Sequence, residues 1–192
     1  MVSHFKYFAI YKPFGYLSQF SREAPNQLTL ADIHDFPPHV YPVGRLDKNS
    51  EGLLILSDDP SLNKALLNPE SHKQKTYLVQ VEGEPSHKDL TPLRHPMQLR
   101  IKKKKVLLKP ADASIIKPPS VQDRTPPIRS RKSIPTTWIQ IKISEGKFHQ
   151  VRKMCASIGF PVLRLIRSEI GTYTLPSFEI GHVWALKKHE LE

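Results

Sequence analysis

The chain of 192 residues is long enough for a hydrophobic core in one domain or two small lobes. Its 29 Lys and Arg against 18 Asp and Glu give a formal net charge of +11, which favours a polyanionic partner over a merely soluble basic surface. One cysteine excludes a disulfide framework and a cysteine-rich zinc site, and no apolar run could span a membrane. Because the N-terminus also lacks the pattern of a signal peptide, we expect a cytoplasmic protein with no membrane partner.

The N-terminal part predicts two strands and a short helix. Residues 6–20 (KYFAIYKPFGYLSQF) begin as a strand, and a proline and a glycine break it just after Lys12. Residues 52–57 (GLLILS) are an apolar run of buried-strand length. Asp59 then offers a helix N-cap, followed by a proline at the first helical position, so we expect a short helix over SLNKALLN.

The middle of the chain predicts strands and one irregular connection. Residues 75–84 (KTYLVQVEGE) alternate with a period of two, which places Tyr77 on the same face as two valines. Residues 100–110 (RIKKKKVLLKP) are a basic run that ends in an apolar strand. Residues 109–135 hold six prolines, with basic residues near their end. We interpret them as an ordered but irregular loop, and a disordered tether is the alternative.

The C-terminal part predicts a strand, a helix and a return to strand. Residues 137–146 (TWIQIKISEG) alternate cleanly, and residues 147–159 (KFHQVRKMCASIG) switch to helical period, with Phe148 on the apolar stripe and a glycine as the stop signal. Residues 161–175 return to strand and turn. Strands, several of them paired antiparallel, together with two to four helices indicate an α+β protein.

Asp47 is the first candidate for chemistry. It follows Arg45 by two residues and lies just before an apolar strand, where a polar side chain can sit at the edge of a cleft. A carboxylate that attacks carbon or takes a proton must be ionised and poorly solvated, and a nearby guanidinium favours the ionised form. The alternative is that Asp47 only caps a turn or a helix start.

Two further candidates have structural alternatives of their own. Arg152 lies roughly 100° from the centre of the helix's apolar stripe, so it could lean into a cleft or be a plain surface arginine. His149 and Lys153 lie nearly opposite the stripe, toward solvent or a partner. Tyr77 is either a core residue or a ring that stacks on a base.

No spacing typical of a metal site, a P-loop or a nucleophile elbow is present, so we expect no metal and no cofactor.

Four segments occur in the order of the motifs of ribosomal RNA pseudouridine synthases that modify single uridines in small- or large-subunit rRNA: YKPFGY, GRLDKNSEGLLILSDD, KTYLVQVEG and EGKFHQVRKMCASIGFPVLRLIRSEIG. PPIRSRKSIPTTW further resembles the subgroup called large-subunit pseudouridine synthase E, which lacks the small N-terminal RNA-binding domain of its relatives. We therefore expect one catalytic domain of two lobes over residues 1–192, without such a module, and with residues 109–135 as a proline-rich basic connection.

The resemblance implies the pseudouridine synthase core, a bent and mostly antiparallel mixed sheet with flanking helices and a central RNA cleft. It implies that Asp47 is the catalytic aspartate, that Tyr77 stacks against the target base and that Arg152 pairs with the aspartate. It also implies that Leu165 packs beneath the pocket. Arg45 matches a residue that helps to hold the RNA once the base has left the stack.

Pseudouridylation breaks the N-glycosidic bond, turns the uracil and joins its C5 to C1′, so neither a redox cofactor nor a group donor is required. The base must first leave its stack. Asp47 would either attack C1′ or remove the C2′ proton, and both routes stay open. We expect RNA contacts from Lys12, Lys103, Lys104, Arg129, Arg131, Lys132, His149 and Lys153. For the run at residues 100–105, a solvated charge cluster is the alternative.

The partner implied is large-subunit (23S) rRNA, free or in an assembling particle, and we expect a monomer. A non-catalytic RNA-binding or ribosome-assembly factor on the same fold is the alternative function. Both predict a basic cleft, but only the enzyme requires Asp47, Tyr77 and Arg152 to converge. A basic ribosomal structural protein would carry long basic tails, and the C-terminal HVWALKKHELE is too mixed in charge and too apolar for that.

Overall fold

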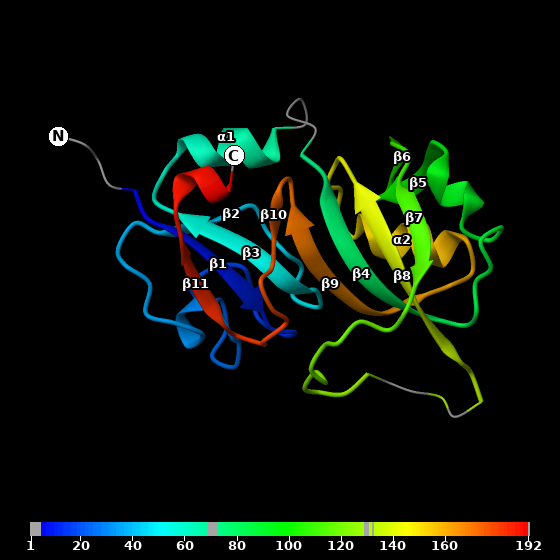
Figure 1. Cartoon of the computed structure of the whole chain (residues 1–192), viewed down its shortest axis with the longest axis horizontal. Helices are drawn as coiled ribbons and strands as arrows, with labels where there is room; N and C mark the ends of the chain where they lie inside the picture. The colour runs from blue at the N-terminus through cyan, green and yellow to red at the C-terminus, as the bar shows by residue number, and fades with distance from the viewer. Residues whose placement is uncertain (1–4, 69–72, 129–130, 132, 192) are drawn as a thin grey trace.

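The computed structural model describes residues 5–68, 73–128, 131 and 133–191, and in these residues a nine-stranded mixed sheet runs along the molecule (Figure 1). Its strands are β1 (Tyr7–Lys12), β2 (Tyr41–Val43), β3 (Glu51–Ser57), β4 (Lys75–Glu82), β7 (Asp112–Ile116), β8 (Thr136–Ile143), β9 (Val162–Ile170), β10 (Tyr173–Thr174) and β11 (Val183–Leu186). The main path runs β11-β1-β3-β9-β4-β8-β7, while β2 pairs with β3 and β10 pairs with β9. The β3–β9 pairing is parallel, and the other strand pairings are antiparallel.

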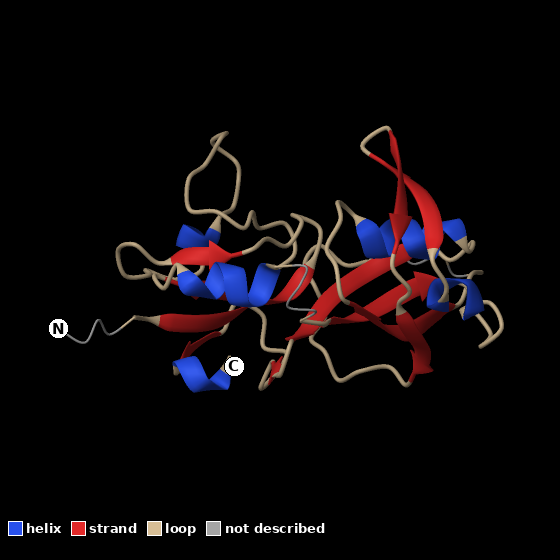
Figure 2. Ribbon diagram, turned by 90° about the horizontal axis from the view of Figure 1, so that it is seen from above, coloured by secondary structure: helices blue, strands red, loops and turns tan. Residues whose placement is uncertain are grey.

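Two short α-helices and one separate hairpin complete the fold. The helices are α1 (Ser61–Leu67) and α2 (Gln150–Ser157), and the 3₁₀ turns are η1 (Leu30–Asp32), η3 (Thr91–Arg94) and η4 (Lys188–Glu190). The hairpin pairs β5 (Met97–Ile101) with β6 (Lys104–Leu108), and it projects from the α2 side of the sheet (Figure 2). No helix in the described part of the chain is long and apolar enough to cross a membrane.

Side chains alternate between the two faces of the sheet, so each face has its own apolar cluster. One cluster joins Leu54 and Val79 to Met154 of α2. The other joins Leu53 to Leu62 of α1. The two helices therefore cover opposite faces, α1 beside β2 and α2 beside β9.

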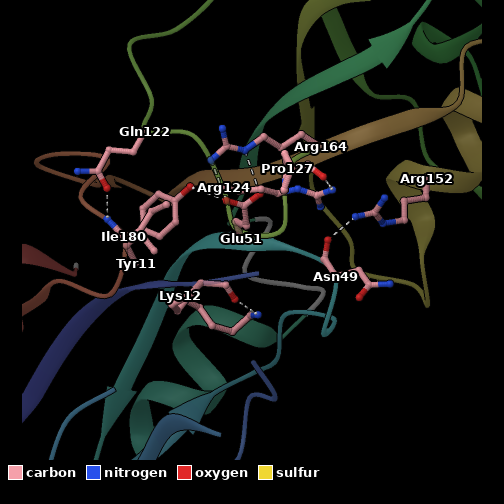
Figure 3. Close-up of polar contacts among 11 residues, drawn as sticks. Tyr11, Lys12, Asn49, Glu51, Gln122, Arg124, Pro127, Arg152, Arg164 and Ile180 are labelled. Carbon is pink, nitrogen blue, oxygen red and sulfur yellow. Dashed lines mark hydrogen bonds and ion pairs between the residues drawn. The ribbon is translucent and has the colours of Figure 1, made fainter. Parts of the chain in front are cut away.

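The sheet has two halves, one of β11, β1, β3 and β2 and the other of β9, β4, β8, β7 and β10. They meet where β3 runs beside β9. Glu51 is 1% exposed and accepts two hydrogen bonds from Arg164, at 3.0 Å from Nε and 2.8 Å from Nη2 (Figure 3). The Tyr11 hydroxyl donates a third bond to this carboxylate at 3.2 Å. A buried carboxylate is tolerated only when it is paired in this way, so the ion pair fixes which residues of β3 and β9 lie side by side.

Gly52, the next residue along β3, permits the close approach of the two strands. Its φ is +97°, in a region that favours glycine, and it pairs with Arg167 of β9. A Cβ at this position would lie 2.3 Å from the main-chain oxygen of Arg167. A larger residue would therefore have to push the two strands apart.

The predicted strands β1, β3, β4, β6, β8 and β9 and both α-helices lie where the sequence indicated, and the α+β class is confirmed. Strand β5 and its pairing with β6 in a hairpin were not predicted. The two-residue turn of this hairpin is Lys102-Lys103, with φ values of +47° and +67°. Such turns normally carry Asn or Gly, so a pair of lysines gives no turn signal.

The proline-rich connection was only partly predicted. β7 lies within residues 109–135 and pairs with β8, whereas residues 117–128 form neither helix nor strand. This irregular part packs on the protein, because the Arg124 guanidinium lies 4.0 Å above the Phe14 ring and the side-chain oxygen of Gln122 accepts a hydrogen bond from a main-chain N–H (Figure 3). The described part therefore fits an ordered loop better than a tether.

We predict that Gly52→Ala destabilises the protein by about 2–5 kcal/mol, because the new Cβ adds backbone strain and a clash with β9. The free energy of unfolding would be measured by urea titration. Gly146→Ala is the matched control, since no atom lies within 4 Å of the added Cβ there, and the expected change is below about 1 kcal/mol. Equal losses in the two variants would contradict this role of Gly52.

Candidate active site

A cavity of about 540 Å³ opens on the sheet face that α2 covers, and both halves of the sheet line it. Its lining includes five residues that the sequence singled out: Arg45, Asp47, Tyr77, His149 and Leu165. The volume is within the range of roughly 300–1,000 Å³ that is typical of ligand sites. Asp47 and Tyr77 therefore line one cavity, whereas Arg152, the third residue that the enzymatic interpretation brings together with them, is not among its lining residues.

Asp47 lies in the turn that leads into β3, and the main chain around it is fixed from several sides. The Ser50 N–H donates to the Asp47 carbonyl at 2.9 Å, and the Gly15 N–H donates to the Lys48 carbonyl at 2.8 Å. The Asp47 side chain is 37% exposed, and among the described residues its ion-pair contact is Nε2 of His149, at 3.7 Å. Because no described N–H donates to the carboxylate, the structure does not support a capping role.

Arg152 is a partly buried residue of α2, as the sequence predicted, but the predicted ion pair with Asp47 is absent from the described contacts. None of the described ion pairs within 4.0 Å joins it to Asp47, so the predicted contact is wrong in this structure. Its guanidinium instead donates to the main-chain oxygen of Asn49, two residues after Asp47 (Figure 3). Burial lowers the pKa of Arg152, and the negative charge of Asp47 partly offsets that shift. Arg152 thus lies within electrostatic range of Asp47 and positions its loop.

Arg167 is a site residue that the sequence analysis missed. It lines the cavity from β9, is 6% exposed, and donates from Nε to the Leu53 carbonyl at 2.9 Å. Its Nη2 is buried with no hydrogen-bond partner in the described residues. A buried cation with an unused donor can stabilise a negative charge that binds or develops in the cavity. Its position two residues after Leu165, on the same strand face, was the available signal.

Tyr77 lies directly across from Arg167 in the pairing of β4 with β9. Its ring is 9% exposed and belongs to the apolar cluster on the α2 face. The strand register shifts between Thr76 and Tyr77, so Ser168 is an extra residue on β9 at this point. Bulges of this kind often redirect side chains beside active sites.

Lys12 is not an RNA contact, contrary to the prediction, because its side chain is fully buried. Its Nζ donates to the carbonyls of Pro13 and Tyr16, at 2.9 and 2.8 Å. These bonds close the turn whose Gly15 N–H holds the chain beside Asp47. Lys12 therefore supports the loop that carries Asp47 from inside the protein.

Of the other predicted RNA contacts in the described residues, His149 lines the cavity and the rest do not. Lys103 and Lys104 are exposed on the hairpin, and Lys153 is half-buried on α2. Arg131 is exposed and forms an ion pair with Glu82 at 3.2 Å. Arg129 and Lys132 lie outside the described residues. No group of three or more His, Cys, Asp or Glu that could hold a metal ion is found in the described part of the chain.

The family model described as RNA pseudouridylate synthase matches residues 6–157. The chain belongs to this family. It is 46% identical over 170 residues to ribosomal large subunit pseudouridine synthase E of Vibrio vulnificus, covering 88% of this chain and 70% of the relative. The protein of the same name from Xanthomonas campestris is 44% identical over 172 residues, covering 88% of this chain and 89% of that relative.

A crystal structure of a pseudouridylate synthase superposes with a TM-score of 0.78 at 27% identity, covering 99% of this chain and 74% of that one. The fold is therefore that of the pseudouridine synthases, as the motifs implied. The protein is a pseudouridine synthase, an isomerase that acts on uridine in RNA.

Burial lowers the pKa of Lys12 from its ordinary value of 10.5 to about 7, although the charges of Glu51 and Asp47 oppose the shift. Between these two pH values the unfolded chain binds a proton that the folded protein does not. Lys12 therefore makes stability rise with pH across this window, by at most about 1.4 kcal/mol per pH unit.

We predict that Lys12→Met removes this contribution, because methionine keeps an apolar stem without a titrating group. The slope of unfolding free energy against pH between 7 and about 10 should fall relative to the unmodified protein. Exposed Lys104, changed to Met, serves as the control and should leave the slope unaltered. Identical slopes in all three proteins would contradict the burial of an uncharged Lys12.

Proposed function

We propose that this enzyme converts a specific uridine of ribosomal RNA, in the large subunit (23S), to pseudouridine, with Asp47 as the catalytic carboxylate. The observation that carries the proposal is the convergence of Asp47, Tyr77 and Leu165 in one cavity. The names of the relatives from Vibrio vulnificus and Xanthomonas campestris support the large subunit as the source of the substrate. It remains a prediction that the enzyme acts as a monomer in the cytoplasm, on free rRNA or on an assembling particle.

The charges of the cavity suit an RNA backbone. Its basic lining residues are Arg45, Lys75, Lys109, Lys147 and Arg167, and its acidic ones are Asp47 and Glu145. Glu145 is already engaged, because its Oε1 accepts hydrogen bonds from the Lys109 N–H and from Gln150, both at 2.9 Å. Basic groups can neutralise phosphates around the cavity, while Asp47 keeps its carboxylate oxygens available for a reacting sugar.

The reaction begins when the target uridine leaves its stack and enters the cavity. The Tyr77 ring then stacks against the uracil, and Leu165 supports the pocket from β9. Asp47 either attacks C1′ as the C1′–N1 bond breaks, or removes the C2′ proton as N1 leaves. On either route the uracil turns and its C5 bonds to C1′. On the first route the Asp47–C1′ bond breaks in this step, and on the second Asp47 returns its proton to C2′. C5 then loses its proton and N1 gains one, so that the product is an isomer.

Two arginines have different parts in this scheme. Arg167 lines the cavity and supplies positive charge there, which favours an ionised Asp47 and the negative charge that develops on the departing uracil. Arg152 is a positioning residue, because it holds the carbonyl of Asn49 and acts on Asp47 only through the loop and at longer range.

We predict that Asp47→Asn folds, binds RNA and makes no pseudouridine, because the amide keeps the shape of the side chain but cannot act as nucleophile or base. Pseudouridines would be mapped in rRNA from cells that lack the protein and are complemented with the wild type or with Asp47→Asn. The wild type should restore one site in 23S rRNA. Restoration by the variant would rule out Asp47, whereas no restoration by either protein would favour the non-catalytic RNA-binding alternative.

We predict that Arg167→Met lowers the single-turnover rate by about 10²–10³-fold, the usual effect of removing a charge-stabilising donor from an active site. Arg152→Met should have a smaller effect, because it removes a contact to the loop rather than a charge that lines the cavity. Rates would be compared at saturating enzyme on the mapped rRNA fragment, with urea titration of both variants as a check on folding. A greater loss in Arg152→Met would restore Arg152 as the principal cation.

A further inference from the structure

An exposed aromatic stack lies at the rim of the cavity. The rings of Phe148 and His149 lie nearly parallel, with an angle of 13° between them and their centroids 3.9 Å apart. Phe148 is 48% exposed, although the sequence placed it on the apolar stripe of the helix. Both residues line the cavity that holds Asp47.

The backbone keeps Phe148 out of the core. Helix α2 begins only at Gln150, and His149 before it has φ +52° and ψ +30°, a left-handed conformation that is unfavourable for a residue with a side chain. This conformation accompanies a 3.7 Å approach of Nε2 to the Asp47 carboxylate. A large ring left in water at a strained turn contributes little to the core, which points to a binding role.

The surroundings of the stack are basic. Nζ of Lys102 lies 5.3 Å from the centre of the Phe148 ring, and Lys102 belongs to the tight turn of the β5–β6 hairpin. This hairpin projects on the α2 side of the sheet (Figure 2). The residues at the start of α2 line the cavity. Aromatic faces beside flexible cations are the combination with which proteins hold unpaired nucleotides, through stacking of the base and neutralisation of its phosphate.

We propose that the Phe148–His149 stack and Lys102 form a second base-binding platform, which holds a nucleotide adjacent to the target uridine. The base stacks on the exposed part of the Phe148 ring, and Lys102 turns to the neighbouring phosphate. The inference rests on the proposed function, because it takes the RNA in the cavity to be the substrate. It adds that the substrate is unpaired at a flanking nucleotide as well as at the target, as in a loop or a bulge.

The platform would be tested with a nine-nucleotide single-stranded oligouridine that carries one central 2-aminopurine, whose fluorescence is quenched when it stacks. The Asp47→Asn background prevents any reaction during the titration. We expect quenching on binding, and in the Phe148→Leu variant a loss of quenching with about tenfold weaker affinity. Phe148→Tyr should retain both signals, because it keeps the ring.

Tyr41→Leu is the matched control, since Tyr41 is an aromatic residue with 63% exposure that does not line the cavity. It should bind and quench like the parent. Lys102→Gln should reduce the slope of log affinity against log salt by about 0.7, the loss of one phosphate contact to a single strand. A perfectly paired duplex with the same 2-aminopurine should show no dependence on Phe148.

The proposal is overturned if the parent protein does not quench the probe, if Phe148→Leu quenches and binds as the parent does, or if Tyr41→Leu loses as much. These outcomes are separate from a failure of the proposed function. A wrong function would appear as missing pseudouridine with the wild type, or as turnover by Asp47→Asn, while the quenching would be unaffected. A wrong platform would leave the wild-type conversion of uridine intact.

Discussion

The geometry of the cavity depends on one seam, where β3 and β9 run parallel. The buried pair of Glu51 with Arg164 and the bare backbone of Gly52 fix which residues face each other there. Asp47 precedes β3, whereas Leu165 and Arg167 lie on β9. A shift at the seam would therefore move the carboxylate relative to both. Because single buried charges are costly, the pair holds this register more strictly than apolar contacts could.

The loop that carries Asp47 is held by its main chain, not by its carboxylate. Ser50 and Gly15 donate to carbonyls of this loop, and Arg152 donates to the carbonyl of Asn49. Lys12 stabilises the adjoining turn from inside the protein. The contacts that fix the position of the loop therefore do not involve the Asp47 carboxylate. The carboxylate is oriented by its backbone, and its oxygens are not consumed by the contacts that orient it.

The sequence motifs singled out Asp47, Tyr77 and Leu165, and these three residues line one cavity. The predictions failed for residues whose side chains can be either buried or exposed in the same local sequence. Arg167 escaped notice because an arginine inside a largely apolar strand gives no hint of an unused donor. Lys12 seemed exposed because it adjoins a proline–glycine turn, and only the closure of that turn buries it.

The errors in secondary structure have a similar origin. The Lys102-Lys103 turn lacks the residues that usually mark a hairpin, so the sequence there gave only a run of basic residues and no turn signal. The helical period in the sequence extended to Phe148, but the left-handed His149 starts the helix later and leaves that ring outside the core. Periodicity gives the face of each residue within an element, but it does not locate the end of the element.

The seam also bears on how the enzyme becomes active as it folds. Glu51 and Arg164 are 113 residues apart in the sequence, whereas β1 pairs with β3 and β4 pairs with β8 over shorter separations. Closing a longer loop has a larger entropic cost, so we expect these two shorter-range pairings to form before the β3–β9 seam closes. The cavity would then be assembled only when the seam closes, and a nascent chain with both of these pairings formed would still lack it.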